Sequence, residues 1–332
     1  MNRRNQVLSL VLAIQIVLTA VIFWPRSTAS GAAAGPLLEN FNAGQVVSLT
    51  IADMDGNRVS LTKGTQGWVL SEADDYPADG QKISELLNKI EGVRTNRPVT
   101  RTESSHQRLK VDEKDFVRLV EVQLADGTTH RVYVGSSPRS NATHVRADNH
   151  PETYLTADLA SYEVNASASG WIDTQYYTLP QTTTVVLTLK NQNGEFEFER
   201  GEEDQWVMKG LAEGENFSQS AFTTLLNQAI AVRMVEPIGR KEEARFGLDQ
   251  PQAEVTLKSA DGQAHTLLIG AKDEKNNNYV AKWSSSPYYV WVAEYTATNF
   301  INKTRADFIE AAGTPTPQAG VPPTDQVPAG GE

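Results

Sequence analysis

The sequence has 332 residues, with 30 Lys and Arg against 41 Asp and Glu, and it contains no cysteine. This length predicts about two domains, each able to bury a core of its own. The formal net charge of -11 and the lack of a dense basic run argue against a nucleic-acid partner, whose phosphates would be repelled. Without cysteine, the chain has no disulfides, no thiolate nucleophile and no thiolate zinc site.

An uncharged apolar run occupies residues 7–24, after Arg3 and Arg4. At 1.5 Å per residue, about 18 helical residues reach about 27 Å, close to the thickness of the hydrocarbon core of a bilayer. The run is longer than the core of a usual signal peptide, so we predict a retained N-terminal transmembrane anchor over residues 1–26. Cleavage after the alanines at 32–34 is the alternative.

The charges that flank the apolar run predict its orientation. Because Arg3, Arg4 and the amino terminus outweigh Arg26, we expect a cytoplasmic N-terminus and an extracytoplasmic bulk, on a single-pass protein of the cytoplasmic (inner) membrane. The lipid bilayer is therefore the first predicted partner, and the bulk is periplasmic or cell-surface. Gln15, inside the run, is a candidate for contact with another transmembrane helix.

Two polar segments flank the predicted folded region. Residues 27–44 are mostly small and polar, which predicts a flexible linker. Residues 311–332 are rich in Pro, Gly and Ala, which predicts a disordered tail. The folded region is then expected over residues 45–310.

The folded region contains an internal repeat. An alternating apolar run, a turn with Gly and a Trp recur at a displacement of 138 positions, as in Trp68 and Trp206. Asp55-Gly56 and Asn193-Gly194 predict a two-residue hairpin near the start of each copy. The copies are expected over residues 45–180 and 181–310.

Each copy continues with a helix and an antiparallel meander. Apolar residues fall at helical spacing in both copies, and Asp79 and Ser218 stand at matching positions for N-caps. The apolar positions are Ile83, Leu86, Leu87 and Ile90 in the first copy, and Phe222, Leu225, Leu226 and Ala229 in the second. Asp-Gly turns and further alternating strands follow in both copies. The predicted fold class is therefore α+β: a tandem duplication of an antiparallel sheet with a helix, after one transmembrane helix.

The second copy carries a recognisable signature. Phe246-Gly247-Leu248-Asp249-Gln250-Pro251 precedes an alternating strand, an Asp-Gly turn and Leu268-Ile269-Gly270. This pattern resembles the signature of domain-of-unknown-function family 4340, a bacterial family of membrane-anchored proteins, many of them encoded near ABC transporter components of the gliding-motility type. The first copy departs from it, with Arg108-Leu109-Lys110-Val111-Asp112 in the same place. The resemblance implies an accessory role beside ABC transporter permease or ATPase subunits or other envelope proteins, and it supplies no catalytic residues.

Chemistry-bearing motifs are scarce. His144, Asp148 and His150 cluster loosely in an expected loop, where solvated residues are a better interpretation than a metal site. Residues 53–57 place Gly too early for an EF-hand, so a hairpin turn is expected there. No Gly-x-Ser-x-Gly elbow or phosphate loop is present. We therefore predict no catalytic, cofactor-binding or metal-binding residues and no enzymatic activity.

Aromatic residues offer the remaining functional hypothesis. The candidates are Tyr176, Tyr177, Tyr288, Tyr289 and Trp291. On an exposed sheet face, such side chains could bind a sugar or a partner peptide. The alternation of residues along a strand favours packing in the core instead. We expect a non-enzymatic scaffolding or accessory protein that uses protein-protein interactions. The alternative is an extracytoplasmic ligand- or glycan-binding module, and a hydrolase is the third possibility.

Overall fold

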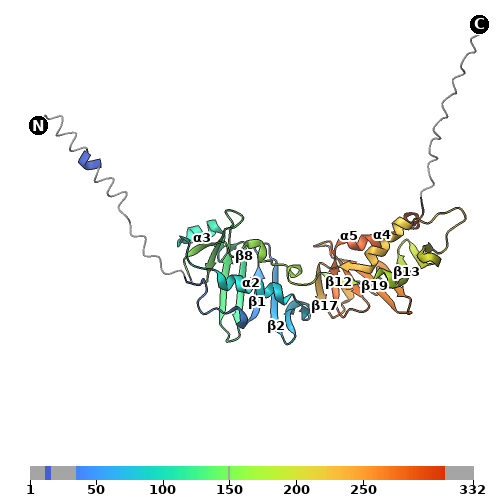
Figure 1. Ribbon diagram of the computed structural model, residues 1–332, viewed down its shortest axis with the longest axis horizontal. Helices are drawn as coiled ribbons and strands as arrows, with labels where there is room; N and C mark the ends of the chain where they lie inside the picture. The colour runs from blue at the N-terminus through green and yellow to red at the C-terminus, as the bar shows by residue number, and fades with distance from the viewer. Residues whose placement is uncertain (1–11, 16–34, 149, 311–332) are drawn as a thin grey trace, which may run out of the picture. The chain divides into compact units, whose positions relative to one another are not determined.

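The computed structural model describes residues 12–15, 35–148 and 150–310 of the protein (Figure 1). Contacts divide the chain into unit 1, with residues 1–71 and 77–172, and unit 2, with residues 72–76 and 173–332. The boundary near 172 lies earlier than the expected position near 180. The reason is that strand β12 (Gln175–Thr178) pairs with β16 (Ala231–Arg233), which is part of unit 2.

The sheet of unit 1 has nine strands in the order β4-β3-β2-β1-β8-β9-β10-β11-β5, although Tyr76 of β4 is assigned by its contacts to unit 2. From β3 to β5, all neighbouring strands run antiparallel. The strands are β1 (Val46–Ala52), β2 (Arg58–Gly64), β3 (Gly67–Leu70), β4 (Tyr76–Pro77), β5 (Pro98–Thr100), β8 (Arg118–Leu124), β9 (Thr129–Val134), β10 (Thr143–Ala147) and β11 (Thr153–Thr156). The other elements are α2 (Gly80–Gly92), α3 (Glu103–Leu109) and the hairpin β6 (Val111–Asp112) and β7 (Asp115–Phe116).

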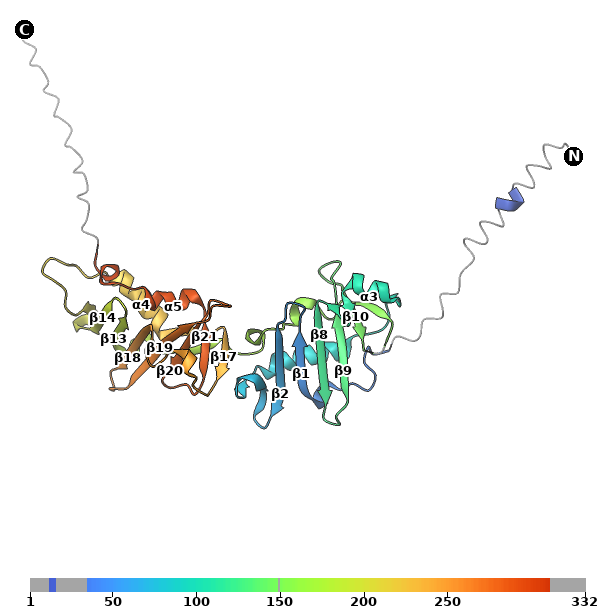
Figure 2. The ribbon, with the colours of Figure 1, turned by 180° about the vertical axis from the view of Figure 1, so that it is seen from behind.

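Helix α2 covers one face of this sheet, in front of the strands in Figure 1 and behind them in Figure 2. Its predicted apolar positions are all buried: Ile83, Leu86, Leu87 and Ile90. The Asp79 side chain accepts hydrogen bonds from the backbone amides of Gln81 and Lys82, so it caps the helix as the sequence predicts. Alternate residues of β1, among them Leu49 and Ile51, are fully buried and form the other half of the core.

Unit 2 contains an eight-stranded antiparallel sheet with the order β15-β14-β13-β18-β19-β20-β21-β17. Its strands are β13 (Thr184–Asn191), β14 (Gly194–Arg200), β15 (Trp206–Met208), β17 (Glu236–Gly239), β18 (Ala253–Ser259), β19 (Ala264–Lys272), β20 (Tyr279–Trp283) and β21 (Tyr289–Val292). The helices α4 (Gln219–Ile230) and α5 (Glu294–Ile301) pack against each other and against β18 (Figure 1). The predicted apolar stripe of α4 is buried, whereas the Ser218 side chain accepts no capping hydrogen bond.

The two sheets share one strand order. From β3 to β5 in unit 1, and from β15 to β17 in unit 2, each strand has a counterpart at the same place in the sheet. The overall class is therefore α+β, with two large antiparallel sheets and few helices, as the sequence predicts.

The first hairpins of the units differ from the expected pair of two-residue turns. In unit 2, Asn191 pairs with Gly194, so two residues connect β13 to β14. In unit 1, five residues, 53–57, connect β1 to β2. The longer loop forms because the Asp53 side chain accepts hydrogen bonds from the backbone amides of Asp55 and Asn57.

Part of the predicted linker is packed into unit 1. Leu37, Leu38 and Phe41 are buried, and the Leu37 amide donates to the Val93 carbonyl. The expectation of a flexible linker through residue 44 therefore needs correction from residue 35 onward. The sequence does not predict their burial, because these three apolar residues stand among small and polar neighbours and show no helix or strand periodicity.

The last strands of the two sheets, β5 and β17, both contain proline. Pro98 stands in β5 and Pro237 in β17, and among the described residues each strand pairs on one side only, with β11 or β21. Proline lacks an amide hydrogen, so it is tolerated at a sheet edge and excluded from central strands.

Several predictions fall outside the described residues. The transmembrane anchor over residues 1–26 is described only at 12–15, which are helical and exposed, and the 311–332 tail is not described. Within the residues that are described, no helix combines the length and apolarity needed to cross a bilayer.

Candidate functional site

The signature residues of unit 2 form a tight crossing over strand β19. Phe246 ends a short 3₁₀ helix (Ala244–Phe246), and Gly247 follows in the left-handed conformation with φ +62°. A Cβ atom at position 270 would lie 2.1 Å from the Phe246 carbonyl oxygen, so only glycine fits there. Phe246 itself is buried against Val280 and Tyr289. These signature residues thus serve backbone geometry and packing.

Unit 1 repeats this crossing with different residues. A Cβ atom at position 135 would lie 2.3 Å from the Leu109 carbonyl oxygen. Lys110 takes the left-handed conformation, with φ +60°, where unit 2 has Gly247. The first copy therefore keeps the turn and loses the Phe-Gly pair, which explains why its sequence departs from the signature.

The polar half of the signature lines a cavity of about 800 Å³ in unit 2. Volumes of about 300–1,000 Å³ are usual for small-molecule sites. Side-chain amides dominate the lining, with residues Asn191, Gln192, Gln250, Gln252 and Asn302. The charged lining residues are Lys190, Asp249 and Glu254, and the remainder are Tyr279, Pro251 and Ile301.

Two of these amides hold the wall of the cavity in place. The Asn191 amide nitrogen donates to the carbonyl oxygens of Phe300 and Lys303, at 2.8 and 2.9 Å. The Gln252 amide nitrogen donates to the Gly270 carbonyl oxygen at 2.9 Å. These bonds attach strand β13 to the end of α5, and the signature segment to β19, so the lining is built on a fixed frame.

Tyr279 is the aromatic member of the lining. Its side chain is 8 % exposed, and the Lys272 ammonium lies 5.8 Å from the centre of its ring. None of the described residues forms a hydrogen bond with its hydroxyl group. This hydroxyl group is therefore available to a ligand or to water.

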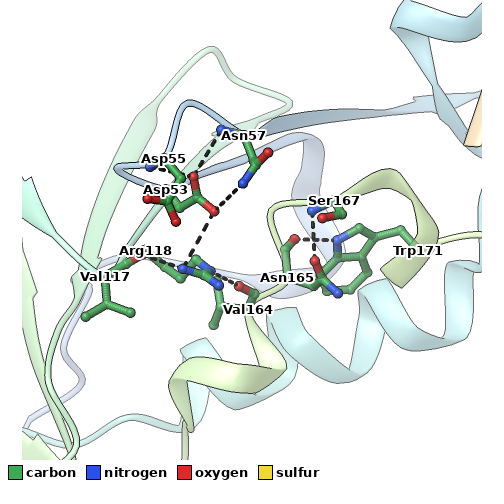
Figure 3. A network of polar contacts seen from close by, with 9 residues as sticks. All are labelled: Asp53, Asp55, Asn57, Val117, Arg118, Val164, Asn165, Ser167 and Trp171. Carbon is green, nitrogen blue, oxygen red and sulfur yellow. Dashed lines mark hydrogen bonds and ion pairs between the residues drawn. The ribbon is translucent and has the colours of Figure 1, made fainter. Parts of the chain in front are cut away.

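Unit 1 builds a closed polar network where unit 2 has Asn191. Figure 3 shows Arg118 between Asp53 and Val164. The Arg118 guanidinium lies 3.8 Å from the Asp53 carboxylate and donates to the Val164 carbonyl oxygen at 2.9 Å. Burial raises the pKa of Asp53, but hydrogen bonds from Asn57 and Asp55 and the charge of Arg118 outweigh it, so the pKa is lowered overall.

The Asp53 network fits the hairpin interpretation and not a calcium loop, because the carboxylate is already bound by groups of the protein. The expectation of a solvated loop residue is wrong for His144, which lies in strand β10 and is buried, with its ring nitrogen Nδ1 2.8 Å from the Ser136 carbonyl oxygen. In the part of the chain that the structure describes, no three His, Asp or Glu side chains are grouped to hold a metal ion.

The candidate aromatic residues have varied exposure. Four are less than 10 % exposed, namely Tyr176, Tyr177, Tyr288 and Tyr289, whereas Trp291 is half-buried and packs beside Phe246. Gln15 is exposed in the short described fragment 12–15.

The hydroxyl groups of the first two tyrosines are bound within unit 2. The Tyr176 hydroxyl donates to the Tyr288 carbonyl oxygen, and the Tyr177 hydroxyl donates to that of Ala229. The Tyr177 ring stacks on Trp283 at 3.7 Å, and burial raises the pKa of Tyr177 well above its ordinary value. Burial with bound hydroxyls is what core packing predicts.

The other pair is bound in the same unit. The Tyr289 hydroxyl donates to the Glu242 carboxylate at 3.2 Å, and the Arg240 guanidinium donates to the Tyr288 hydroxyl. The structure therefore concentrates available polar groups at the cavity and not at the predicted aromatic residues. The sequence does not predict the cavity, because its lining comes from separate segments; the polar residues 249–252 beside the signature are a local signal of it.

Comparisons with known proteins identify the family alone. No curated protein and no solved structure matches the chain. The model of the family described as "Domain of unknown function (DUF4340)" matches residues 68–239 and 229–321, which together cover most of the sequence. The chain therefore belongs to this domain-of-unknown-function family.

Proposed function

We propose that this protein is a membrane-anchored extracytoplasmic accessory or scaffolding subunit without enzymatic activity, working in an ABC-transporter-linked or envelope complex. The transmembrane helix over residues 7–24 holds it to the cytoplasmic membrane, with the N-terminus in the cytoplasm. Its partners are permease or ATPase subunits, of the gliding-motility type that the family resemblance implies, or other envelope proteins.

The observation that carries this proposal is the apolar run at residues 7–24, behind Arg3 and Arg4. A polar Gln15 in such a run is favourable where a neighbouring helix offers a hydrogen-bond partner. The two folded units then lie outside the membrane, where they are accessible to envelope partners.

The distribution of polar groups supports a binding role over a catalytic one. Two residues that could have been metal ligands instead contact backbone groups. The Asp53 side chain orders a loop, and the His144 ring contacts a backbone carbonyl oxygen. Family signature residues such as Phe246 and Gly270 build a backbone crossing.

The second candidate function is an extracytoplasmic ligand-binding module. The observation that favours it is the cavity of about 800 Å³ in unit 2, with its amide-rich lining. The two candidate functions are compatible, because an accessory subunit of a transport complex can also bind a ligand.

Co-purification from native membranes after crosslinking tests the first proposal. The full chain is compared with a variant whose residues 1–26 are replaced by a cleavable signal peptide. We expect ABC transporter permease or ATPase subunits, or another defined envelope complex, only with the anchored form. Recovery of no membrane partner with either form would contradict the proposal.

Two substitutions in the anchor refine this experiment. Gln15→Leu removes the only amide side chain in the run, and Thr19→Val is the matched polar-to-apolar control. We expect Gln15→Leu to reduce partner recovery several-fold, which is the loss of about 1 kcal/mol of interhelical hydrogen bonding. Equal loss with Thr19→Val would assign the effect to general hydrophobicity.

A further inference from the structure

We propose that the cavity of unit 2 binds a neutral, polyhydroxylated ligand of the sugar class, through the side chains of Gln250, Asn302 and Tyr279. This inference rests on the second candidate function, ligand binding, and it names the site and the class of ligand. The charge, the hydrogen-bonding capacity and the apolar surface of the lining all favour this class of ligand.

The charges of the lining disfavour an anionic ligand. Lys190 contributes one positive charge, whereas Asp249 and Glu254 contribute two negative charges, so the lining has a net charge of +1 − 2 = −1. Lys190 and Glu254 stand opposite each other in the β13–β18 pairing, so the single cation has an acidic neighbour. A phosphate or carboxylate ligand would therefore meet more repulsion than attraction.

The amides of the lining match hydroxyl groups. A side-chain amide offers two donors and an acceptor with two lone pairs, and a hydroxyl group can use both kinds. In the described part of the chain, the side chains of Gln192, Gln250 and Asn302 have no hydrogen-bond partner. Asn191 and Gln252 are already bound to backbone carbonyls, so they fix the frame while the other three remain available.

The apolar part of the lining matches the carbon face of a sugar ring. Tyr279, Pro251 and Ile301 line the same cavity as the amides. An aromatic ring combined with a free hydroxyl group offers both an apolar surface and a directed hydrogen bond. Tyr279 is 8 % exposed as a whole, and its hydroxyl group has no partner among the described residues, so it is available to a ligand that enters the cavity.

Unit 1 uses the matching segment differently. Where unit 2 has a bent segment at residues 249–252, unit 1 forms the β6–β7 hairpin, in which Asp112 pairs with Asp115. The Lys110 ammonium binds the Asp115 carboxylate at 2.8 Å. The segment is thus closed on itself in unit 1, and the proposed site is specific to unit 2.

Titration of the full-length protein in detergent micelles with chitotriose, and separately with maltotriose, tests the proposal. We expect saturable binding of at least one sugar by calorimetry or saturation-transfer NMR, unchanged between about 50 and about 500 mM NaCl. Gln250→Ala and Tyr279→Phe should each weaken it about 3- to 10-fold, the loss of one hydrogen bond. Gln263→Ala, at an exposed glutamine in the β18–β19 turn, is the matched control and should bind like the wild type.

Three outcomes would overturn the proposal. Binding of neither sugar at millimolar concentration would do so, and so would sugar binding that Gln250→Ala and Tyr279→Phe leave unchanged. The third is salt-sensitive binding of spermidine that Asp249→Asn abolishes, with no sugar binding, which would make the cavity a cation site. Spermidine binding alone would reject the sugar class but retain the ligand-binding function. Binding of none of the three probes, chitotriose, maltotriose or spermidine, would reject the sugar class and the ligand-binding function together.

Discussion

Asp53 and Asn191 stand at equivalent positions, 138 residues apart, and each fastens the end of its strand to the C-terminal part of its own unit. Asn191 does so directly, through two carbonyl oxygens at Phe300 and Lys303. Asp53 does so through Arg118, which donates to the Val164 carbonyl oxygen. The two units therefore fasten the end of this strand in different ways, unit 1 through an ion pair with an arginine and unit 2 through a side-chain amide.

Substituting Asn191 should destabilise unit 2. Asn191→Ala removes the donor to two carbonyl oxygens, and we expect a loss of about 2 kcal/mol in the free energy of unfolding. Asn191→Asp should cost at least as much, because a carboxylate cannot donate and would face the same carbonyl oxygens. Gln192→Ala, at an exposed neighbour, is the control and should change stability by less than about 0.5 kcal/mol. Chemical denaturation measures all three, and a neutral Asn191→Asp would contradict the anchoring role.

The Asp53 network should give unit 1 a stability term that depends on pH. Because the folded pKa of Asp53 lies below its ordinary value, the stabilisation is present above about pH 4, the pKa of an unfolded aspartate, and is lost as the pH falls through the folded pKa. Asp53→Asn should therefore lower the free energy of unfolding near neutral pH, by about 1–3 kcal/mol. The difference from the wild type should shrink in acid below about pH 4. Asp55→Asn, at an exposed carboxylate of the same loop, is the control, and a pH-independent difference for Asp53→Asn would refute this prediction.

Glu236 should act in the opposite direction. Burial raises the pKa of its carboxyl group, so the folded state favours the neutral form. The wild type should lose stability as the pH rises from about 4.3, the pKa of an unfolded glutamate, through the raised folded pKa. Glu236→Gln removes this loss and should stabilise unit 2 near neutral pH, on the order of 1 kcal/mol, with little difference in acid. Thermal melts across pH, with Glu274→Gln as an exposed control, test this; a destabilised Gln variant near neutral pH would show that the carboxylate has a favourable partner.

Gly270→Ala should be among the most damaging small substitutions in unit 2. The added Cβ atom would meet the Phe246 carbonyl oxygen at 2.1 Å, so the backbone has to shift, at a cost of about 3 kcal/mol. Gly262→Ala is a matched control because its Cβ atom would meet no atom within 4 Å, although its φ is +86°. We expect it to cost only about 1 kcal/mol, from the left-handed backbone alone. Similar losses in the two variants would show that the crossing tolerates movement.

The sequence predicted those parts of the fold that depend on local periodicity. The α2 stripe from Ile83 to Ile90 and the Asp79 cap were readable because helix spacing and capping involve neighbouring residues. The burial of Leu37 was not readable, since its backbone partner is Val93, more than fifty residues away. The turn at Asp53 was placed correctly but given the wrong length, because the side chain competes for backbone amides.

The cavity escaped prediction for a similar reason. Asn191, Asp249, Tyr279 and Asn302 come from four separate segments, and no spacing in the sequence relates them. The two adjacent tyrosine pairs, Tyr176-Tyr177 and Tyr288-Tyr289, were candidates for an exposed binding surface, yet all four side chains lie in the core. Polar residues beside an apolar signature, such as Asp249 and Gln250 after Phe246, are therefore the more informative kind of signal for a site.

The prolines in β5 and β17 limit how copies of this protein can associate. Proline has no amide hydrogen, so Pro98 and Pro237 each remove one hydrogen-bond donor from a strand at the edge of a sheet. Copies of the protein are thereby hindered from merging their sheets into a continuous fibre at these edges. At these two edges, association is left to side-chain recognition, which can be selective for a partner in a way that backbone pairing cannot.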